Sequence, residues 1–400
     1  MHTGNRIPRA CRITCPAALV MAATASMASA QWTVVNLHPA GASGESRGFG
    51  VQGGQQVGFA RISGVGTHAS MWSGTAAWWV DLSPAGSDFS EANGVFGGQQ
   101  VGRAVMGGVN HACVWRGTAE SWLDLQPAGA TGSEGIGISG SQQVGWASVD
   151  GANRASLWSG SAASWINLHP EGATDSVAYG VSDGQQVGRT FMSGIDHASL
   201  WSGSAASWVD LSLPAGGSSY AYKISGGQIV GVKNQHAALW TGTAASWVDL
   251  NPSGSTESGA FGVHGGQQVG WAYVPGDGVH SHAMLWRGTA ASTVDLHAFA
   301  APLGFQDSQA RSIIHTGGVT YVIGDGYHTA RGRSEALMWV QPCFNCRADF
   351  NCSGSLTVQD IFDFINAWFA GDPRGDFNGA NGINVTDIFS FLDAWFMGCP

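Results

Sequence analysis

Charged residues are scarce in this chain. Only 11% of its 400 residues are Asp, Glu, Lys or Arg, well below the roughly 25% of an average soluble domain. Acidic residues outnumber basic ones by 27 to 17, and the formal net charge is -10. An acidic chain with few lysines lacks the basic surface that nucleic acids and anionic membranes require. We therefore expect no nucleic-acid partner, whereas cations and neutral glycans are compatible with this composition.

Long apolar runs and familiar catalytic motifs are also missing. No segment after residue 30 reaches the 18 or so apolar residues that span a bilayer, so we expect no membrane span. The sequence has no nucleophile elbow, no HExxH motif and no phosphate-binding loop. We therefore favour a protein that is not an enzyme.

The first 30 residues have the pattern of a secretory signal peptide. Arg6, Arg9 and Arg12 precede a short apolar run from Pro16 to Ala23, and Ala28-Ser29-Ala30 fits cleavage before Gln31. We expect an exported chain that is extracellular or held at the cell surface.

Cysteines fall into two groups in the mature chain. Cys113 stands alone and replaces a Ser in a repeated strand, which predicts a buried free thiol. The other four lie near the C-terminus, where an even set in an exported chain favours two disulfides with three possible pairings over a four-Cys zinc site. These four are Cys343, Cys346, Cys352 and Cys399.

One repeat of about 43 residues accounts for most of the chain. The Gly that ends a QQVG-like element recurs at Gly58, Gly102, Gly145, Gly188, Gly231, Gly270 and Gly324. The best copy has four apolar runs separated by Gly, Ser, Asp and Pro, which predicts four strands. These are Ser176–Val181, Gln185–Met192, His197–Trp201 and Ser207–Leu211.

Four strands in such a repeat indicate a β-propeller blade, and the frame of the repeat indicates a closed ring. The chain enters at Trp32 to Leu37, which matches only a fourth strand, and the repeats end at Glu335 to Trp339, which matches only a third. We predict a seven-bladed all-β propeller over residues 31–340, in which the N-terminal strand completes the last blade and leaves few exposed edges.

Several polar groups recur once per blade and are therefore expected to be structural. A His opens the third strand in five blades, whereas Arg154 and Glu335 replace it in two. An Asp of a WVDL-like element recurs in the fourth strand, and a Trp ends each third strand, where we expect it to pack between blades.

A second set of acids stands just before the innermost strand, in the loop that joins successive blades. If these loops surround one mouth of the channel, the acids form a partial ring for a cation or for sugar hydroxyls; the alternative is solvated turn carboxylates. The set is Glu45, Glu91, Glu134, Asp175 and Glu257. Longer loops at Val274 to His282 and at Gly324 to Ser334 carry His, Asp and Arg and are expected to be surface loops rather than a metal site.

The chain changes character at Gln341 and Pro342. After a linker over 341–346, residues 347–400 contain two acidic loops at an offset of 27, each followed by apolar residues whose spacing predicts one apolar face of a helix. These residues are Ile361, Phe362, Ile365, Trp368 and Phe369 after the first loop, and Ile388, Phe389, Leu392, Trp395 and Phe396 after the second. The first loop has calcium-ligand spacing with Gly354 at the turn, and its ligands would be Asp349, Asn351, Ser353, Ser355, Thr357 and Asp360. The second would bind more weakly through Asp376, Asn378, Gly382, Asn384 and Asp387, since Ala380 offers no ligand. The alternative is a pair of Asx-rich helix caps without metal.

This C-terminal region resembles a type I dockerin, and more closely the Cys-flanked dockerin-like tails of secreted bacterial proteins. The likeness covers about Cys346 to Cys399 and is carried by DFNxxGxxxVQD, IFDFINAWFAGDPR and AWFMGC. It implies calcium-stabilised folding and docking to a cohesin-like or cell-envelope receptor. Two positions that help dockerins choose a cohesin are Val358-Gln359 and Val385-Thr386 here, in place of hydroxyl pairs.

The repeats are similar to the HAF-type extracellular repeat, in which a His-Ala-Phe strand recurs. Here that strand reads His-Ala followed by Ser, Cys, Ala or Met, as in His68-Ala69-Ser70. This likeness implies an extracellular location rather than an activity.

Together these features predict a monomeric, secreted, non-catalytic recognition or display protein. Its propeller would bind a glycan or protein ligand, and its dockerin-like tail would mediate calcium-dependent attachment. Two alternatives stay open: a glycan-active enzyme, either a hydrolase or a lyase, and a purely structural spacer.

Overall fold

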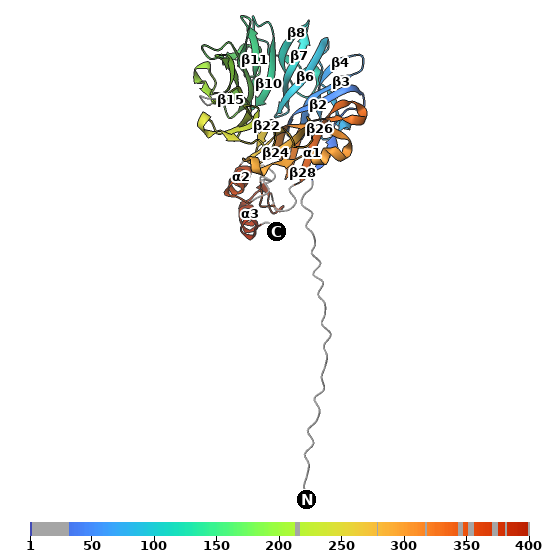
Figure 1. The fold of residues 1–400 in the computed structure, drawn as a ribbon, viewed down its shortest axis with the longest axis vertical. Helices are drawn as coiled ribbons and strands as arrows, with labels where there is room; N and C mark the ends of the chain where they lie inside the picture. The colour runs from blue at the N-terminus through green and yellow to red at the C-terminus, as the bar shows by residue number, and fades with distance from the viewer. Residues whose placement is uncertain are drawn as a thin grey trace.

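Seven antiparallel sheets of four strands form a ring in the computed structural model of this chain (Figure 1). The structure describes residues 1, 32–212, 217–277, 279–316, 318–342, 347–350, 356–369, 375–380 and 382–398. The predicted seven-bladed propeller is confirmed, with strand order following chain order outward in six blades. The signal peptide predicted over 1–30 and the four C-terminal cysteines lie outside the described residues, apart from Met1.

The two inner strands of each blade form long hairpins. The innermost strands are β2 (Ala42–Gln52), β6 (Ser87–Phe96), β10 (Ser133–Ser139), β14 (Asp175–Ser182), β18 (Ser219–Ser225), β22 (Ser258–His264) and β26 (Phe305–Thr316). The second strands are β3 (Gln55–Ile62), β7 (Gln99–Met106), β11 (Gln142–Val149), β15 (Gln185–Met192), β19 (Gln228–Lys233), β23 (Gln267–Tyr273) and β27 (Val319–His328).

The QQVG glycine of each second strand is required by its close approach to the innermost strand. A Cβ on Gly188 would lie 1.9 Å from the carbonyl oxygen of Val177, and the other six blades give 1.8 or 1.9 Å at the same position. The recurrence that revealed the repeat therefore has a steric cause.

The third strands carry the residues that hold neighbouring blades together. They are β4 (Gly66–Trp72), β8 (Val109–Trp115), β12 (Ala152–Trp158), β16 (Ile195–Trp201), β20 (His236–Trp240), β24 (Ser281–Trp286) and β28 (Arg333–Pro342). The seven Trp side chains are fully buried. Trp115, for example, packs on Val57, Met71 and Leu82 of the preceding blade, so the predicted role of these tryptophans between blades is confirmed.

The outermost strands are shorter than predicted. They are β5 (Val80–Asp81), β9 (Leu123–Asp124), β13 (Ile166–Asn167), β17 (Val209–Asp210), β21 (Val248–Asp249), β25 (Val294–Asp295) and β1 (Thr33–Asn36). Ser207, predicted to begin a strand, instead ends a 3-10 turn, because its Oγ donates to the carbonyl of Ser204 at 2.6 Å. The six such turns are η1 (Ala76–Trp78), η2 (Ala119–Ser121), η3 (Ala162–Ser164), η4 (Ala205–Ser207), η5 (Ala244–Ser246) and η6 (Ala290–Ser292).

The N-terminal strand closes the ring, as predicted. Strand β1 pairs antiparallel with β28, with Thr33 opposite Val340, and Leu37 N–H donates to the Ala336 carbonyl at 2.9 Å. Between β25 and β26 lie α1 (His297–Ala300) and η7 (Ala301–Leu303), and η8 (Thr329–Arg331) joins β27 to β28.

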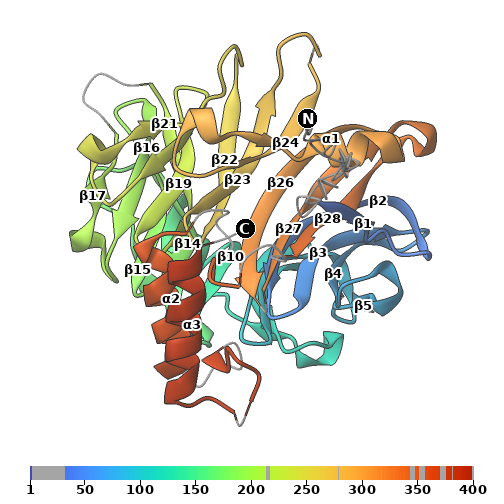
Figure 2. The same cartoon turned by 90° about the horizontal axis from the view of Figure 1, so that it is seen from below.

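Two further helices follow the ring. Helices α2 (Val358–Phe369) and α3 (Val385–Met397) lie side by side outside the blades (Figure 2). Phe364 and Phe391 are buried at the centre of a hydrophobic core made entirely of C-terminal residues, where their rings stack at 4.2 Å. The core of this region is thus separate from those of the propeller.

The apolar face predicted for these helices is divided in the structure. Ile361, Ile365 and Trp368 pack on the shared core, but Phe362 and Phe369 are exposed. In helix α3, Phe389 and Phe396 are exposed in the same way. The predicted burial of these four Phe side chains was wrong because Phe364 and Phe391 occupy the centre of the shared core, which leaves the four on the solvent-facing side of their helices. Among the described helices, none is long and apolar enough to cross a membrane.

Candidate ligand site in the central channel

A bulge in every innermost strand places one residue of each blade at the central channel. The register of pairing shifts between Gly48 and Gly50 in blade one, and at the matching position in all seven blades. Such bulges aim a side chain out of the regular alternation. The seven bulge residues are Phe49, Asn93, Ile136, Tyr179, Tyr222, Phe261 and Arg311.

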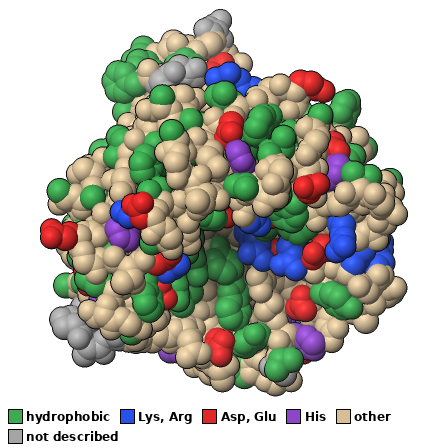
Figure 3. Space-filling view, turned by 90° about the horizontal axis from the view of Figure 1, so that it is seen from above, with side chains coloured by type: hydrophobic (Ala, Val, Ile, Leu, Met, Phe, Trp, Pro, Cys, Tyr) green, Lys and Arg blue, Asp and Glu red, His purple; other side chains and the backbone are tan. Residues whose placement is uncertain are grey.

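These seven residues line a cavity of about 340 Å³, together with Glu91, Glu134, Lys223 and Ser312. A hollow with hydrophobic and basic side chains in its wall opens near the middle of the face shown in Figure 3. Ligand pockets in proteins begin at roughly 300 Å³, so this cavity has room for a small ligand or for the end of a longer one.

One side of the cavity is aromatic. The ring centroids of Tyr179 and Tyr222 are 5.4 Å apart, and those of Tyr222 and Phe261 are 5.3 Å apart. The Arg311 guanidinium continues this arc, since it lies 5.6 Å from the Phe261 ring and 5.5 Å from the Phe49 ring. Flat apolar faces with polar edges suit ligands that combine ring C–H groups with hydroxyls.

The opposite side is polar and hydrogen-bonded. Arg103 Nε donates to Glu91 at 2.9 Å and its Nη1 lies 3.9 Å from Glu134. Glu134 also accepts from Asn93 Nδ2 at 3.0 Å and from Trp146 Nε1 at 3.1 Å. Burial raises the pKa of Glu91, although the charge of Arg103 opposes this effect.

The predicted acidic ring is only partly at this site. Glu91 and Glu134 line the cavity, whereas Glu45, Asp175 and Glu257 are not among its lining residues. Glu91 and Glu134 follow the repeated Ser of the innermost strand, but the other three precede it and therefore lie two positions further from the bulge. The predicted loop location was also wrong for all but Glu257, since the other four acids lie within innermost strands.

Two of the acids outside the cavity are held by arginines. Glu45 pairs with Arg47 at 3.1 Å. Asp175 accepts from Arg189 Nη2 at 2.6 Å, while Arg189 Nη1 bonds Asp196 at 2.7 Å. Glu45 and Asp175 are therefore compensated within their own blades.

The sequence pattern did not lead us to predict the bulge residues or Lys223 as site residues. A signal was present, because the third position after the repeated Ser differs between copies while the flanking positions are mostly Gly or Ala. Variation inside an otherwise constant strand indicates a side chain that faces a ligand site rather than a neighbouring blade.

The repeated His and Asp residues bond one another, as predicted for a structural role. His68 Nδ1 lies 2.7 Å from Asp81 Oδ2, and the four other pairs span 2.8 or 2.9 Å. The second oxygen of Asp81 accepts the backbone N–H of Ser83 at 2.8 Å. The five pairs are His68–Asp81, His111–Asp124, His197–Asp210, His236–Asp249 and His282–Asp295.

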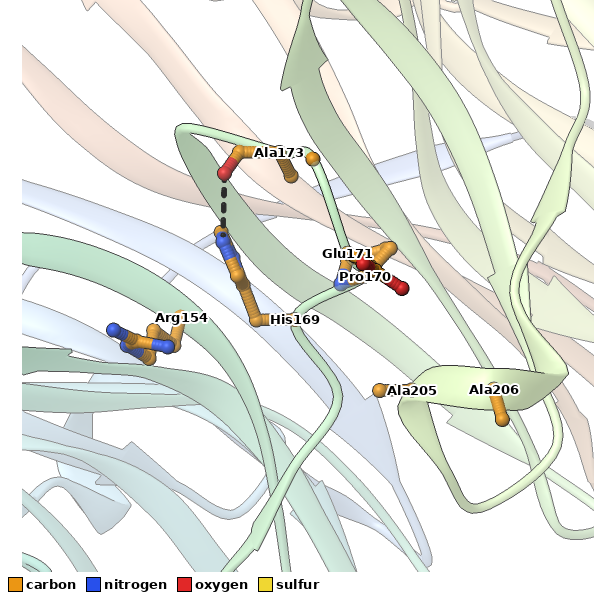
Figure 4. Close-up of a pocket in the computed structure, with 8 residues that line it drawn as sticks. Arg154, His169, Pro170, Glu171, Ala173, Ala205 and Ala206 are labelled. Atoms are coloured by element: carbon orange, nitrogen blue, oxygen red, sulfur yellow. Dashed lines mark hydrogen bonds between the residues drawn. The ribbon is translucent and has the colours of Figure 1, made fainter.

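A broad surface cavity of about 600 Å³ lies beside blade four (Figure 4). His169 lines it, but both ring nitrogens are engaged, by Ser176 Oγ at 2.7 Å and by the Ala173 carbonyl at 3.0 Å. Burial lowers the pKa of His169, which favours the neutral form of its ring. Cys113 is a buried free thiol, as predicted, and burial raises its pKa well above the ordinary value.

The two longer loops form no metal site among the described residues. Asp277 and His282 meet at 2.6 Å, whereas His280 faces Gln306 at 2.9 Å. The segment from Gly324 to Ser334 is not a loop, since strands β27 and β28 occupy most of it.

The second acidic loop of the C-terminal region is arranged around Asp387. Its carboxylate accepts the backbone N–H groups of Asn378 at 3.0 Å and Asn384 at 2.8 Å, and these bonds, led by that of Asn378, lower its pKa. Asn384 also caps helix α3, as the alternative of Asx-rich helix caps requires. Among the described residues, Asp376 Oδ1 is buried without a hydrogen-bond partner, which leaves an oxygen suited to a hard cation such as Ca²⁺.

The first acidic loop is described only in part. Asp360 Oδ2 accepts from the backbone of Thr357 at 2.8 Å, repeating the contact of Asp387 with Asn384. The predicted ligands Asn351, Ser353 and Ser355 lie outside the described residues.

No protein-family model matches this sequence, and no curated protein matches it. Solved structures do. Two structures of puromycin hydrolase, one of them the S511A mutant complexed with PGG, have TM-scores of 0.51 and identities of 12% and 11%. The alignments cover 75% of this chain and 56% of the hydrolase, so the chain spans little more than half of its length.

The β-propeller domain of the Trilobed protease from Pyrococcus furiosus is also similar. It has a TM-score of 0.43 and 9% identity over 74% of this chain and 95% of that domain. At such low identity, the likeness to puromycin hydrolase shows a shared propeller fold alone.

Proposed function

We propose that this protein is an exported recognition or display protein whose propeller channel binds a glycan. The observation that carries the proposal is the ring of seven bulge residues around one cavity, with an aromatic arc on one side and hydrogen-bonding groups on the other. Sugar rings present both C–H faces and hydroxyls, and this lining offers a surface for each. A protein ligand entering the channel is the other possibility for the same lining.

The C-terminal region supports a second part of the proposal, calcium-dependent attachment to a cohesin-like or cell-envelope receptor. Each helix exposes two Phe side chains at equivalent places, and exposed apolar clusters of this kind mark interaction sites. They are Phe362 and Phe369 on α2, and Phe389 and Phe396 on α3. In this proposal the acidic loops hold calcium, which fixes the helices so that these side chains face the receptor.

The recognition proposal is tested by measuring glycan binding to the mature chain, residues 31–400, in calcium. A panel of polysaccharide oligomers is titrated by calorimetry against the wild type and against Tyr222→Ala and Phe261→Ala. We expect at least one oligomer to bind, and each substitution to weaken it by about tenfold because a stacking surface is lost. Trp78→Ala, which removes an exposed aromatic side chain outside the channel, is the matched control. Binding that survives both channel substitutions would place the site elsewhere.

A glycan-active enzyme is the second candidate, because Glu91 and Glu134 both line the cavity, both lie near Arg103, and burial raises the pKa of Glu91. Glycoside cleavage usually uses a pair of carboxyl groups, one of which has a raised pKa so that it can act as the acid. Release of reducing ends from the same panel, abolished by Glu91→Gln, would favour this candidate. No release from any bound oligomer would favour recognition.

A further inference from the structure

Lys223 interrupts the repeat at the position after the bulge, where it lines the channel cavity. The residue after the bulge is Gly in five blades, because a Cβ there would lie 2.7 to 3.2 Å from a neighbouring atom. Blade seven has Ser312, and blade five alone has a long side chain. The five glycines are Gly50, Gly94, Gly137, Gly180 and Gly262.

The Lys223 side chain is enclosed by protein and still reaches open space. It is half-buried, and it lines the channel cavity beside Tyr222. Burial lowers the pKa of its ammonium group. Among the described residues, no hydrogen bond or ion pair to Lys223 is found.

The other charges of the cavity wall are already compensated. Glu91 pairs with Arg103, and Arg311 Nε bonds Asp325 at 2.7 Å. Glu134 accepts two hydrogen bonds and lies near Arg103. Lys223 is therefore the one lining charge, among the described residues, that lacks an opposite partner, and an enclosed charge without a partner costs free energy.

We propose that the channel binds an acidic sugar, with the carboxylate of a uronic acid on Lys223 Nζ and its ring against Tyr179, Tyr222 and Phe261. This inference rests on the proposed glycan recognition and names the class of glycan. A single free ammonium balances the single charge of a carboxylate. A doubly charged phosphate would keep one unbalanced negative charge in a cavity that Glu91 and Glu134 also line. Asn93 and Ser312 line the same cavity and have side-chain oxygens that can bond ring hydroxyls.

The test compares each acidic oligomer with its own neutral form. Trimers of galacturonate, glucuronate and mannuronate are titrated into the mature chain, beside trimers whose carboxylates have been reduced to primary alcohols. We expect one acidic trimer to bind about tenfold more tightly, or better, than its reduced form, since a charge-assisted hydrogen bond is lost on reduction.

The two lysines of the chain provide matched variants. Lys223→Gly supplies the residue that five other blades already have, and Lys223→Met keeps the apolar stem; both should abolish the preference for the acid. Lys233→Met is the control, because Lys233 lies over the Trp247 ring at 5.6 Å and does not line the cavity. A preference that persists in both Lys223 variants would overturn the inference.

The possible outcomes distinguish the inference about Lys223 from the proposal that the channel binds a glycan. Equal binding of acidic and reduced trimers would leave glycan recognition standing and remove the role of Lys223. No binding by any trimer, acidic or neutral, would count against both.

A second measurement does not depend on a substitution in the channel. Reductive methylation with ¹³C-formaldehyde labels only Lys223, Lys233 and the N-terminus, so the titration of each amine can be followed by NMR. Binding of the acidic trimer should raise the pKa of Lys223 and leave that of Lys233 unchanged. Other charged and titratable groups near Lys223 influence its pKa equally in the free and the bound protein; they are Glu91, Glu134, Arg103, Arg311, Tyr179 and Tyr222. An unchanged pKa of Lys223 in the presence of bound trimer would therefore rule out direct contact.

Discussion

At the scale of single residues, the two side chains that are paired between the third and fourth strands of a blade change together. In five blades a His faces an Asp. Where the His is absent, the Asp is absent too: Arg154 is matched with Asn167, and Glu335 with Asn36. Asn36 Nδ2 donates to Glu335 at 2.6 Å. An Asp at position 36 would instead place two carboxylates together, which explains why both members of the pair change.

This pairing predicts a rescue experiment in blade two. His111→Glu should lower the free energy of unfolding by about 1 kcal/mol, since a half-exposed hydrogen bond is replaced by two like charges. Adding Asp124→Asn should recover most of the loss, because it recreates the pair found in blade seven. Urea unfolding of the two single variants and the double variant measures the coupling; effects that simply add would show that the two positions are independent.

The QQVG glycine is the residue on which the bulge and the channel depend. Gly188→Ala places a methyl group 1.9 Å from the Val177 carbonyl, so we expect a loss of about 3 kcal/mol in the free energy of unfolding. Gly41→Ala is the control, because no atom lies within 4 Å of its added Cβ. Similar midpoints of urea unfolding for the two variants would contradict this steric account.

At the scale of elements, strand β1 is fixed to blade seven by a buried charge. Glu335 is fully buried and bonds Asn36, Arg331 and Arg333. Burial alone would raise the pKa of Glu335, but the hydrogen bonds from Asn36, Arg333 and Arg331 outweigh it and hold the pKa below the ordinary value.

The sign of this pKa shift predicts how ring closure depends on pH. A carboxyl whose pKa is lower in the folded state contributes stability above its unfolded pKa of about 4.3, and that contribution is lost as the pH falls through the folded value. Glu335→Gln should therefore cost about 2 kcal/mol at pH 7 and flatten the loss of stability between about pH 5 and pH 3. Parallel pH profiles for the variant and the wild type would show that Glu335 does not control closure.

How much of each element the sequence predicts depends on whether its signal is local. Hairpins bounded by Gly, Ser and Asp were predicted within a residue or two, as for Gln185–Met192. The fourth strand was predicted too long because the Ser204 to Ser207 hydrogen bond forms a turn that apolar periodicity does not report. The exposed face of α2 was predicted wrongly for a related reason, since only packing decides whether Phe362 or Phe364 is buried.

The channel could be predicted only in outline. Seven copies of the repeat determine the ring, and the acids beside the repeated Ser indicated polar groups near its axis. The side chains that reach the cavity are chosen by the bulge, and a bulge depends on pairing between strands rather than on the residue it displaces. Lys223 was not predicted as a site residue because our predictions relied on residues that recur in every blade, and Lys223 occurs in one blade alone.

At the scale of the whole molecule, the described residues form hydrophobic cores of two kinds. Each propeller cluster joins residues of adjacent blades, whereas the C-terminal cluster draws only on residues from Ala348 onward. The propeller clusters are linked through blades that they share, whereas the C-terminal cluster includes no residue of any blade, and units of this kind can unfold separately. We therefore expect two thermal transitions and a response to calcium in only one of them.

Calcium removal tests this independence directly. With excess EGTA, the transition of the C-terminal region should fall by about 10 °C or more, because a cation bound only to the folded state adds several kcal/mol to a small unit. The propeller transition should stay within about 2 °C. Asp376→Asn should reproduce part of the effect in calcium, since it removes charge from the carboxylate whose buried Oδ1 has no partner among the described residues. If the temperature of the C-terminal transition changes with neither EGTA nor this substitution, the acidic loops serve only as helix caps. If the temperature of the propeller transition changes together with that of the C-terminal transition, the two regions are coupled.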